Sequence, residues 1–347
     1  MQTIIRILEI KMQRIVRLNS PVVFSSYAAV GGREESRGRY GDRFDLCDRS
    51  DLFGMKTFEM AEGEMCRCAL NIALGRAGVA HSDIDLLFAG DLQNQCSASS
   101  IGLHSFGIPF LGIYGACSTC TEGLLLASAM MEADADCERA AVVTSSHNSA
   151  AERQFRNPLE YGGQRAGTAQ WTSTAAGAFI LGRDGGRVKI TEYMPGRVID
   201  GASSDGANMG PAMAFAAADS IISYFDLSGE KPENFDYIVT GDLGKYGSCV
   251  LEDILYEKYP TAARRHTDCG LLLYDQALQD VHAGASGCGT SAALLALEFL
   301  PALERGDIKN ILFLSTGALM NPSVLLQGSD IYGVAPLIRI EASGEKG

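Results

Sequence analysis

Short apolar runs alternate along this chain with longer stretches in which apolar and small residues recur at helical spacing. The short runs predict buried strands at Ile84–Gly90, Ala140–Ser145, Ala175–Leu181, Tyr237–Gly241 and Ile311–Ser315. The longer stretches predict helices at Thr57–Gly78, Leu124–Met131, Pro211–Phe225, Cys249–Tyr259 and Ala292–Leu303. Alternating strands and helices predict an α/β fold in which sheets with parallel strands are covered by helices.

The pattern occurs twice. Gly115-Ala-Cys117-Ser-Thr119 and Ser286-Gly-Cys288-Gly-Thr290 are each followed by an apolar helix and then by an apolar strand that ends in serine, at Ser145 and Ser315. Upstream, Gly90-Asp-Leu92 parallels Gly241-Asp-Leu243 at an offset of 151 residues, whereas the two cysteines are 171 residues apart. Ordered self-similarity of this kind indicates a duplicated unit. We therefore expect halves at 1–185 and 186–347 that superpose, with about 20 extra residues of the second half at 259–280 and the two cysteine helices side by side.

The cysteine turn of the first half is a candidate site of chemistry. A strand that turns directly into a helix places Cys117 near unpaired backbone N–H groups and the positive end of the helix dipole. A thiolate is stabilised there and could act as a nucleophile. The alternative is a small buried cysteine in a crowded junction between a strand and a helix.

This arrangement resembles the thiolase superfamily, which includes thiolases and ketoacyl-acyl carrier protein synthases. A closer resemblance is to the stage V sporulation protein AD family, over roughly residues 19–340. The first-half motifs that carry it are Ala89-Gly-Asp-Leu-Gln-Asn-Gln95, Gly107-Ile-Pro-Phe-Leu-Gly112, Gly115-Ala-Cys-Ser-Thr119, Thr144-Ser-Ser-His-Asn148, Ala151-Glu-Arg-Gln-Phe-Arg156 and Glu160-Tyr-Gly-Gly-Gln164. The second-half motifs are Gly196-Arg-Val-Ile-Asp200, Asp268-Cys-Gly-Leu271 and Ala285-Ser-Gly-Cys288. The resemblance implies a thiolase-like fold with two pseudo-symmetric halves in αβαβα layers.

The resemblance also implies a function. It points to a non-catalytic thiolase-like protein that binds dipicolinic acid, either free or as its calcium chelate, for uptake into the developing spore. Other stage V sporulation membrane proteins are the implied partners, and a peripheral position at the spore inner membrane is the implied location. One alternative is an acyltransferase or condensing enzyme that uses Cys117, and another is a scaffold for the membrane partners.

The second half departs from the catalytic pattern of the superfamily. Where the synthases place a catalytic histidine after the central strand, this chain has Asp242-Leu-Gly-Lys245. The thiolase Gly-His-Pro-x-Gly motif is approximated at residues 280–287, but His282 is displaced by one position. Without a well-placed base a thiol near its usual pKa is mostly protonated at neutral pH, so we expect an incomplete catalytic set around Cys117.

Dipicolinate is flat, aromatic and doubly negative, so its site needs donors for two carboxylates and an apolar slot for the ring. We expect the Cys117 turn, with Ser118, to hold one carboxylate. We expect Arg153 or Arg156, with His147 near them, to reach toward this turn, so that the ligand bridges the two. These arginines and the histidine belong to the polar, aperiodic stretch 145–167, which we expect to be a loop that leaves the carboxyl end of a central strand. Further candidate contacts are Asn148 in this loop and Ser286 in the second cysteine turn.

Composition narrows the remaining classes. A net charge of −13 argues against nucleic acid as a partner. The ten cysteines lack the spacing of a disulfide framework and predict a reducing, intracellular compartment. We expect no metal site, no cofactor and no transmembrane segment; the basic stretch 1–18 is either a β-rich arm, with Met12 an alternative start, or an amphipathic helix on a membrane surface. A homodimer is one option for assembly.

Overall fold

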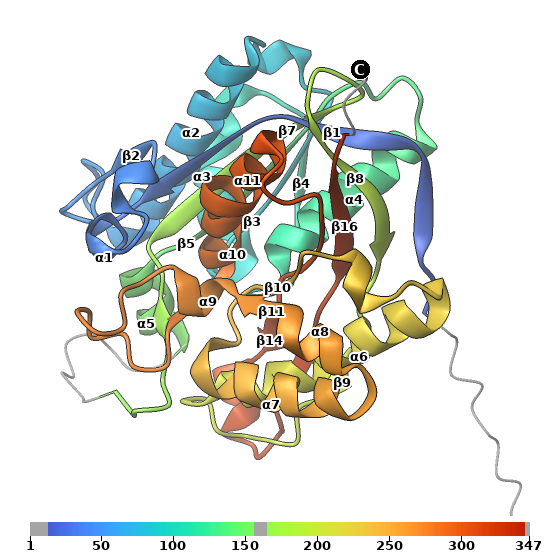
Figure 1. Ribbon diagram of the computed structural model, residues 1–347. Coiled ribbons are helices and arrows are strands. Elements are labelled where there is room, and N and C mark those ends of the chain that lie inside the picture. The colour runs from blue at the N-terminus through green and yellow to red at the C-terminus, as the bar shows by residue number, and fades with distance from the viewer. Residues whose placement is uncertain (1–12, 156–164, 344–347) are drawn as a thin grey trace, which may run out of the picture.

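The computed structural model describes residues 13–155 and 165–343 (Figure 1). The strands that the first half contributes to the main sheet are β1 (Val16–Gly31), β3 (Leu86–Gly90), β4 (Phe110–Gly112), β5 (Ala140–Ser146) and β7 (Ala175–Gly182), and the two-residue β2 (Leu46–Cys47) pairs with β1. Those of the second half are β8 (Val188–Met194), β10 (Tyr237–Thr240), β11 (His266–Asp268), β13 (Asn310–Leu314) and β16 (Leu337–Ala342). Each strand predicted from an apolar run is present, with ends that differ by two residues at most.

The two halves arrange their strands in the same order. From the outer edge inward, the first half runs β4-β3-β5-β7-β1 and the second runs β11-β10-β13-β16-β8. In each half the three outer strands pair in parallel and the two inner strands pair antiparallel. β1 and β8 pair antiparallel where the halves meet. This repeated order confirms the duplication, and the boundary expected at 185 and 186 lies in the turn between β7 and β8.

The helices form three layers, one central layer and one outer layer on each side. In the first half they are α1 (Arg33–Arg37), α2 (Phe58–Ala77), α3 (Ser97–Leu103), α4 (Thr119–Ala133) and α5 (Asn148–Phe155). In the second half they are α6 (Met209–Ser228), α7 (Gly244–Lys258), α8 (Pro260–Arg265), α9 (Cys269–Leu272), α10 (Cys288–Leu294), α11 (Leu300–Arg305) and α12 (Pro322–Leu325). Thr57 caps α2 by accepting a hydrogen bond from the Met60 backbone N–H, and Gly78 ends it at a φ of 67°.

Alternating side chains of the strands separate the layers. On β5, Val142 packs into the central core with α4 and α10, whereas Val143 packs into an outer core with α2. On β13, Phe313 faces the same central core and Leu312 faces the outer core under α6 and α7. Figure 1 shows α4 and α10 between the outer helices α2 and α7. The molecule therefore has the predicted αβαβα layers, with the two cysteine helices in the middle.

Two sequence predictions need correction. The polar stretch 145–167 was expected to be a loop, but residues 148–155 form helix α5. The extra residues of the second half lie mainly at 269–287, because Cys117 follows the end of β4 by five residues and Cys288 follows the end of β11 by twenty. Of the stretch 1–18, residues 1–12 lie outside the described part of the chain, and β1 begins at Val16.

Candidate functional site

Cys117 lies in a tight turn between β4 and α4. Ala116 has a φ of 52°, in the left-handed region, which turns the chain sharply into the helix. The hydroxyl of Ser118 donates to the Gly115 carbonyl at 2.7 Å, and that of Thr119 donates to the Ala116 carbonyl at 2.6 Å. Two side chains thus brace the turn, and Cys117, which is 6% exposed, lies just ahead of the helix as predicted.

The buried carboxylate of Asp242 lies against this turn. Asp242 follows β10, and its carboxylate accepts hydrogen bonds from the Gly287 N–H at 2.8 Å and the Thr316 hydroxyl at 3.0 Å. The Cys117 thiol donates to the same carboxylate. Burial raises the pKa of Asp242 to about 7, although these hydrogen bonds oppose that shift. Asp242 begins the segment that replaces the catalytic histidine motif of the synthases. A buried acidic group therefore lies beside Cys117 at this position.

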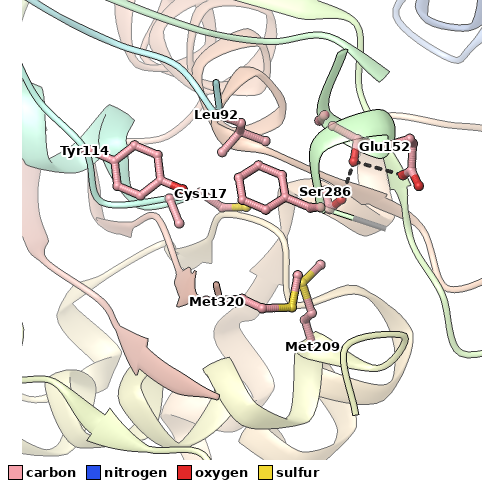
Figure 2. A pocket seen from close by; sticks show the side chains of 12 residues that line it. Leu92, Tyr114, Cys117, Glu152, Met209, Ser286 and Met320 are labelled. Carbon is pink, nitrogen blue, oxygen red and sulfur yellow. Dashed lines mark hydrogen bonds between the residues drawn. The ribbon is translucent and has the colours of Figure 1, made fainter. Parts of the chain in front are cut away.

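A mostly apolar hollow opens beside Cys117 (Figure 2). It holds about 450 Å³ of empty space, including the part that is open to solvent. Its walls come from both halves and consist of Leu92, Tyr114, Ala116, Cys117, Ala151, Glu152, Phe155, Thr172, Met209, Ser286, Ala318 and Met320. Of the residues that the sequence singled out, Cys117 and Ser286 line this hollow.

One side of the hollow carries a short polar chain. Two-residue strands β6 (Trp171–Thr172) and β12 (Ala285–Ser286) pair in parallel and bring Thr172 beside Ser286. The Thr172 hydroxyl lies 3.5 Å from the Ser286 hydroxyl and 3.3 Å from a carboxylate oxygen of Glu152. Figure 2 shows this chain to one side of Cys117, with Tyr114 on the other.

The residues expected to bring positive charge to the Cys117 turn lie elsewhere. Arg153 forms an ion pair with Glu59 at 3.1 Å and lies over the ring of Phe58, because it projects from α5 toward α2. His147 is fully buried and its Nε2 lies 2.8 Å from the Asp51 carbonyl oxygen. The structure therefore does not bring Arg153 or His147 to the Cys117 turn.

The other candidates have structural partners or fall outside the description. Asn148 donates to the Thr172 carbonyl at 3.1 Å and so supports the wall of the hollow from behind. His282 contacts the Ala166 carbonyl and the Asp280 carboxylate, and it does not line the hollow. Arg156 lies outside the described residues. The roles of all these residues in ligand binding stay predictions.

Several lining residues were not predicted from the sequence, because they lie on a helix that was expected to be a loop. On α5, Ala151, Glu152 and Phe155 face the hollow at helical spacing, whereas Arg153 falls on the opposite side. In a loop, sequence position does not show which side chains point the same way, so Glu152 could not be told from Arg153 as a lining residue. Met209 and Met320 lie far from both cysteines in the sequence and belong to none of the motifs described above.

The second cysteine has a different environment from the first. Cys288 is fully buried, and its thiol donates to the Ser145 carbonyl at 2.9 Å. Burial raises the pKa of Cys288 well above its usual value. It packs with Cys117 and Leu92 in one small cluster behind the hollow. All ten cysteines are free thiols.

Charge and metal ligands are sparse at the site. The twelve lining residues, all in the described part of the chain, include Glu152 but no lysine, arginine or histidine. Across residues 13–155 and 165–343, no group of three or more histidine, cysteine, aspartate or glutamate side chains is arranged to hold a metal ion. In the same ranges no helix has the length and apolar character needed to span a membrane.

Solved structures with a similar fold include condensing enzymes. A variant of OleA from Xanthomonas campestris matches with a TM-score of 0.60 at 14% identity, over 94% of this chain and 100% of that one. AbyA1, a tetronic acid condensing enzyme, matches with a TM-score of 0.58 at 15% identity over 92% and 100%. 3-Oxoacyl-[acyl-carrier-protein] synthase III from Aquifex aeolicus VF5 matches with a TM-score of 0.54 at 13% identity over 91% and 99%. At these identities the likeness establishes the thiolase-like fold alone.

Sequence relatives are more specific. The profile of the family described as Stage V sporulation protein AD matches residues 12–341. Stage V sporulation protein AD from Bacillus subtilis (strain 168) is 38% identical over 324 residues, which cover 93% of this chain and 95% of that protein. The chain therefore belongs to the stage V sporulation protein AD family.

Proposed function

We propose that this chain is a non-catalytic binding protein of sporulation that holds dipicolinate, as its calcium chelate, in the hollow beside Cys117, for uptake into the developing spore. The family and its sporulation context support the setting. The observation that carries the proposal is the lining of the hollow, which is apolar except for hydroxyls and a single carboxylate among the described residues.

The charge of this lining favours the chelate over the free ligand. Dipicolinate alone is a dianion, and none of the described residues that line the hollow is a lysine, arginine or histidine that would balance its charge. The one-to-one chelate with Ca²⁺ is neutral, so an apolar pocket accepts it at a much lower desolvation cost. Ca²⁺ takes six to eight oxygen ligands, and dipicolinate leaves several of these positions open. Glu152, Thr172 and Ser286 present carboxylate and hydroxyl oxygens on one side of the hollow to fill them.

The neighbourhood of Cys117 supports a binding role rather than acyl transfer. An activated cysteine needs a base or a cationic partner that stabilises its thiolate. Here the thiol donates to the Asp242 carboxylate, whose negative charge repels that of a thiolate. No described residue that lines the hollow is a histidine or an asparagine, the usual base and oxyanion donors of the superfamily. The arrangement therefore suits a protonated thiol that forms part of a wall.

Titration calorimetry with dipicolinate, with and without Ca²⁺, tests the proposal. Wild-type protein should bind the chelate, and Glu152→Gln should weaken that binding about tenfold to a hundredfold, because a charge-assisted contact is lost. The same variant should bind metal-free dipicolinate no worse than wild type, since a like charge is removed. Glu59→Gln is the matched control, because Glu59 pairs with Arg153.

Other outcomes would support the alternatives. Absence of dipicolinate binding by the wild-type protein would contradict the proposal and favour a scaffold for membrane partners. A mass increase of one acyl group after incubation with acyl thioesters, absent in Cys117→Ala, would show a condensing or acyl-transfer enzyme.

We also propose that other stage V sporulation membrane proteins are the partners of this chain, at the spore inner membrane.

The exposed edge of the first half suggests a second kind of assembly. A homodimer is proposed through β4, because this edge strand exposes Phe110 and Leu111, at 40% and 44%, beside Tyr114. An apolar edge strand with unpaired backbone groups is suited to pairing with a second copy.

A further inference from the structure

Two methionines, Met209 and Met320, form one wall of the hollow. Figure 2 shows both side chains on the side of the hollow opposite Leu92. Tyr114 and Phe155 supply aromatic rings elsewhere in the lining. A ligand in this space therefore contacts polarisable sulfur on one side and aromatic or aliphatic groups on the other.

Each methionine lies at or just before the start of a helix whose first turn contains a proline. Met209 is the first residue of α6 and precedes Pro211 by two positions, and Met320 precedes Pro322 by two positions at the start of α12. Proline fixes its own φ and restricts the residue before it. Asn321 also caps α12 by accepting from the Ser323 and Val324 N–H groups. The two flexible side chains thus reach the lining of the hollow from the starts of two different helices.

Their surroundings differ from those of a methionine that fills a gap in a core. Met213, in the same helix α6, is fully buried in the outer core of the second half. Met209 and Met320 are only partly buried, and their side chains border empty space. Thioether sulfur makes favourable contacts with aromatic rings, especially at the ring edge, and adapts its shape to them.

We infer that Met209 and Met320 are specificity-determining residues that select a flat aromatic ring over a puckered, saturated ring with the same carboxylates. The inference rests on the proposed function and adds the groups that recognise the ring, separately from the groups that meet its carboxylates and calcium. The same wall would give an aliphatic chain no comparable advantage from sulfur–ring contact.

The test compares two ligands that differ only in the ring. Calcium chelates of dipicolinate and of cis-piperidine-2,6-dicarboxylate are titrated into the full-length protein by calorimetry. Wild type should prefer the aromatic ligand. Met320→Leu and Met209→Leu preserve side-chain volume but remove sulfur, so each should lower this preference about two- to tenfold and leave the affinity for the saturated ligand unchanged. Met213→Leu, in the core of the same helix, should leave the preference at the wild-type value.

A spectroscopic readout accompanies the titration. Methyl resonances of ¹³C-labelled methionine, assigned with the two leucine variants, should shift for Met209 and Met320 when calcium dipicolinate is added. They should shift less with the saturated ligand, which has no ring current. Equal affinity of wild type for both ligands, or an undiminished preference in both leucine variants, would overturn the inference while leaving dipicolinate binding intact. Binding of neither ligand would remove the proposed function and this inference with it.

Discussion

Asp91 and Asp242 occupy equivalent corners of the two halves and have different partners. Each follows the central parallel strand of its half in a Gly-Asp-Leu sequence. Asp91 accepts from the Gln93 N–H at 2.8 Å and from the backbone and hydroxyl of Ser99 at 2.8 and 2.6 Å, all within its own half. Asp242 accepts from Gly287 and Thr316 and also from Cys117 of the other half. Duplication thus supplied two equivalent corners, and of these two aspartates Asp242 is the one bonded to Cys117, which lines the hollow.

The edge strands of the two halves differ in their exposure to solvent. β4 exposes Phe110, Leu111 and Gly112, whereas its counterpart β11 is half-buried to buried beside α7 and α8. If β4 is the dimer edge, Leu111→Lys should abolish association, because a charge would have to be buried at the interface. Sedimentation equilibrium checks the mass. The exposed Leu278→Lys, in the second half, is the control and should leave the dimer intact. A wild-type protein that sediments as a monomer would contradict the proposed dimer.

The pH dependence of stability should reveal the Asp242 corner. Its folded-state pKa of about 7 exceeds the unfolded value near 4, so the stabilisation is fully present below pH 4 and is lost as the pH rises toward 7. Between pH 4 and pH 7 the free energy of unfolding of wild type should therefore fall by roughly 2–4 kcal/mol more than that of Asp242→Asn. Urea unfolding at several pH values measures it.

Asp226, whose pKa is lowered rather than raised, provides a comparison with Asp242. Lys258 and Tyr259 hold the pKa of Asp226 below its usual value, so Asp226→Asn should change the slope in the opposite sense, at lower pH. Identical slopes for wild type and Asp242→Asn would show that the Asp242 carboxyl has no raised pKa.

The residues that precede the two cysteines should respond differently to substitution. Gly287 has a φ of 101°, and a Cβ there would lie 2.6 Å from the Ser146 hydroxyl. Gly287→Ala should therefore lower the free energy of unfolding by about 1–3 kcal/mol. Ala116 already holds a positive φ, so Ala116→Gly relieves strain and should change stability by less than about 1 kcal/mol. Equal effects in urea unfolding would contradict this difference between the turns.

The smallest expected effect concerns the reactivity of Cys117. Asp242→Asn removes a carboxylate that repels a thiolate, so alkylation of Cys117 by iodoacetamide at pH 8 should be roughly tenfold faster. Asp91→Asn should leave the rate near that of wild type. Peptide mapping by mass spectrometry follows Cys117 separately from the exposed Cys249. A slower reaction in Asp242→Asn would identify Asp242 as a base and would favour the enzyme alternative.

The repeated apolar pattern predicted two similar α/β halves, because burial on both faces of the central strands leaves a strong signal in sequence. The thiolase-like arrangement in αβαβα layers came from the family resemblance. It also predicted Cys117 at the turn and Ser286 near it. The orientation of α5 was not predictable from the polarity of 145–167, so the sequence could not show that Glu152 lines the hollow while Arg153 pairs with Glu59. The contact between Asp242 and Cys117 depends on the packing of two halves against each other, which local patterns do not report.

β1 has a consequence for how the chain reaches its native state. Residues 23–31 of this strand pair with β7, about 150 positions later in the chain, and residues 16–23 pair with β8 of the second half. On the ribosome the first half could close its five strands once β7 has emerged, but the beginning of β1 must wait for β8. Such distant pairing predicts slow folding. It also predicts that the first half expressed alone leaves the start of β1 as an unpaired edge, prone to aggregation.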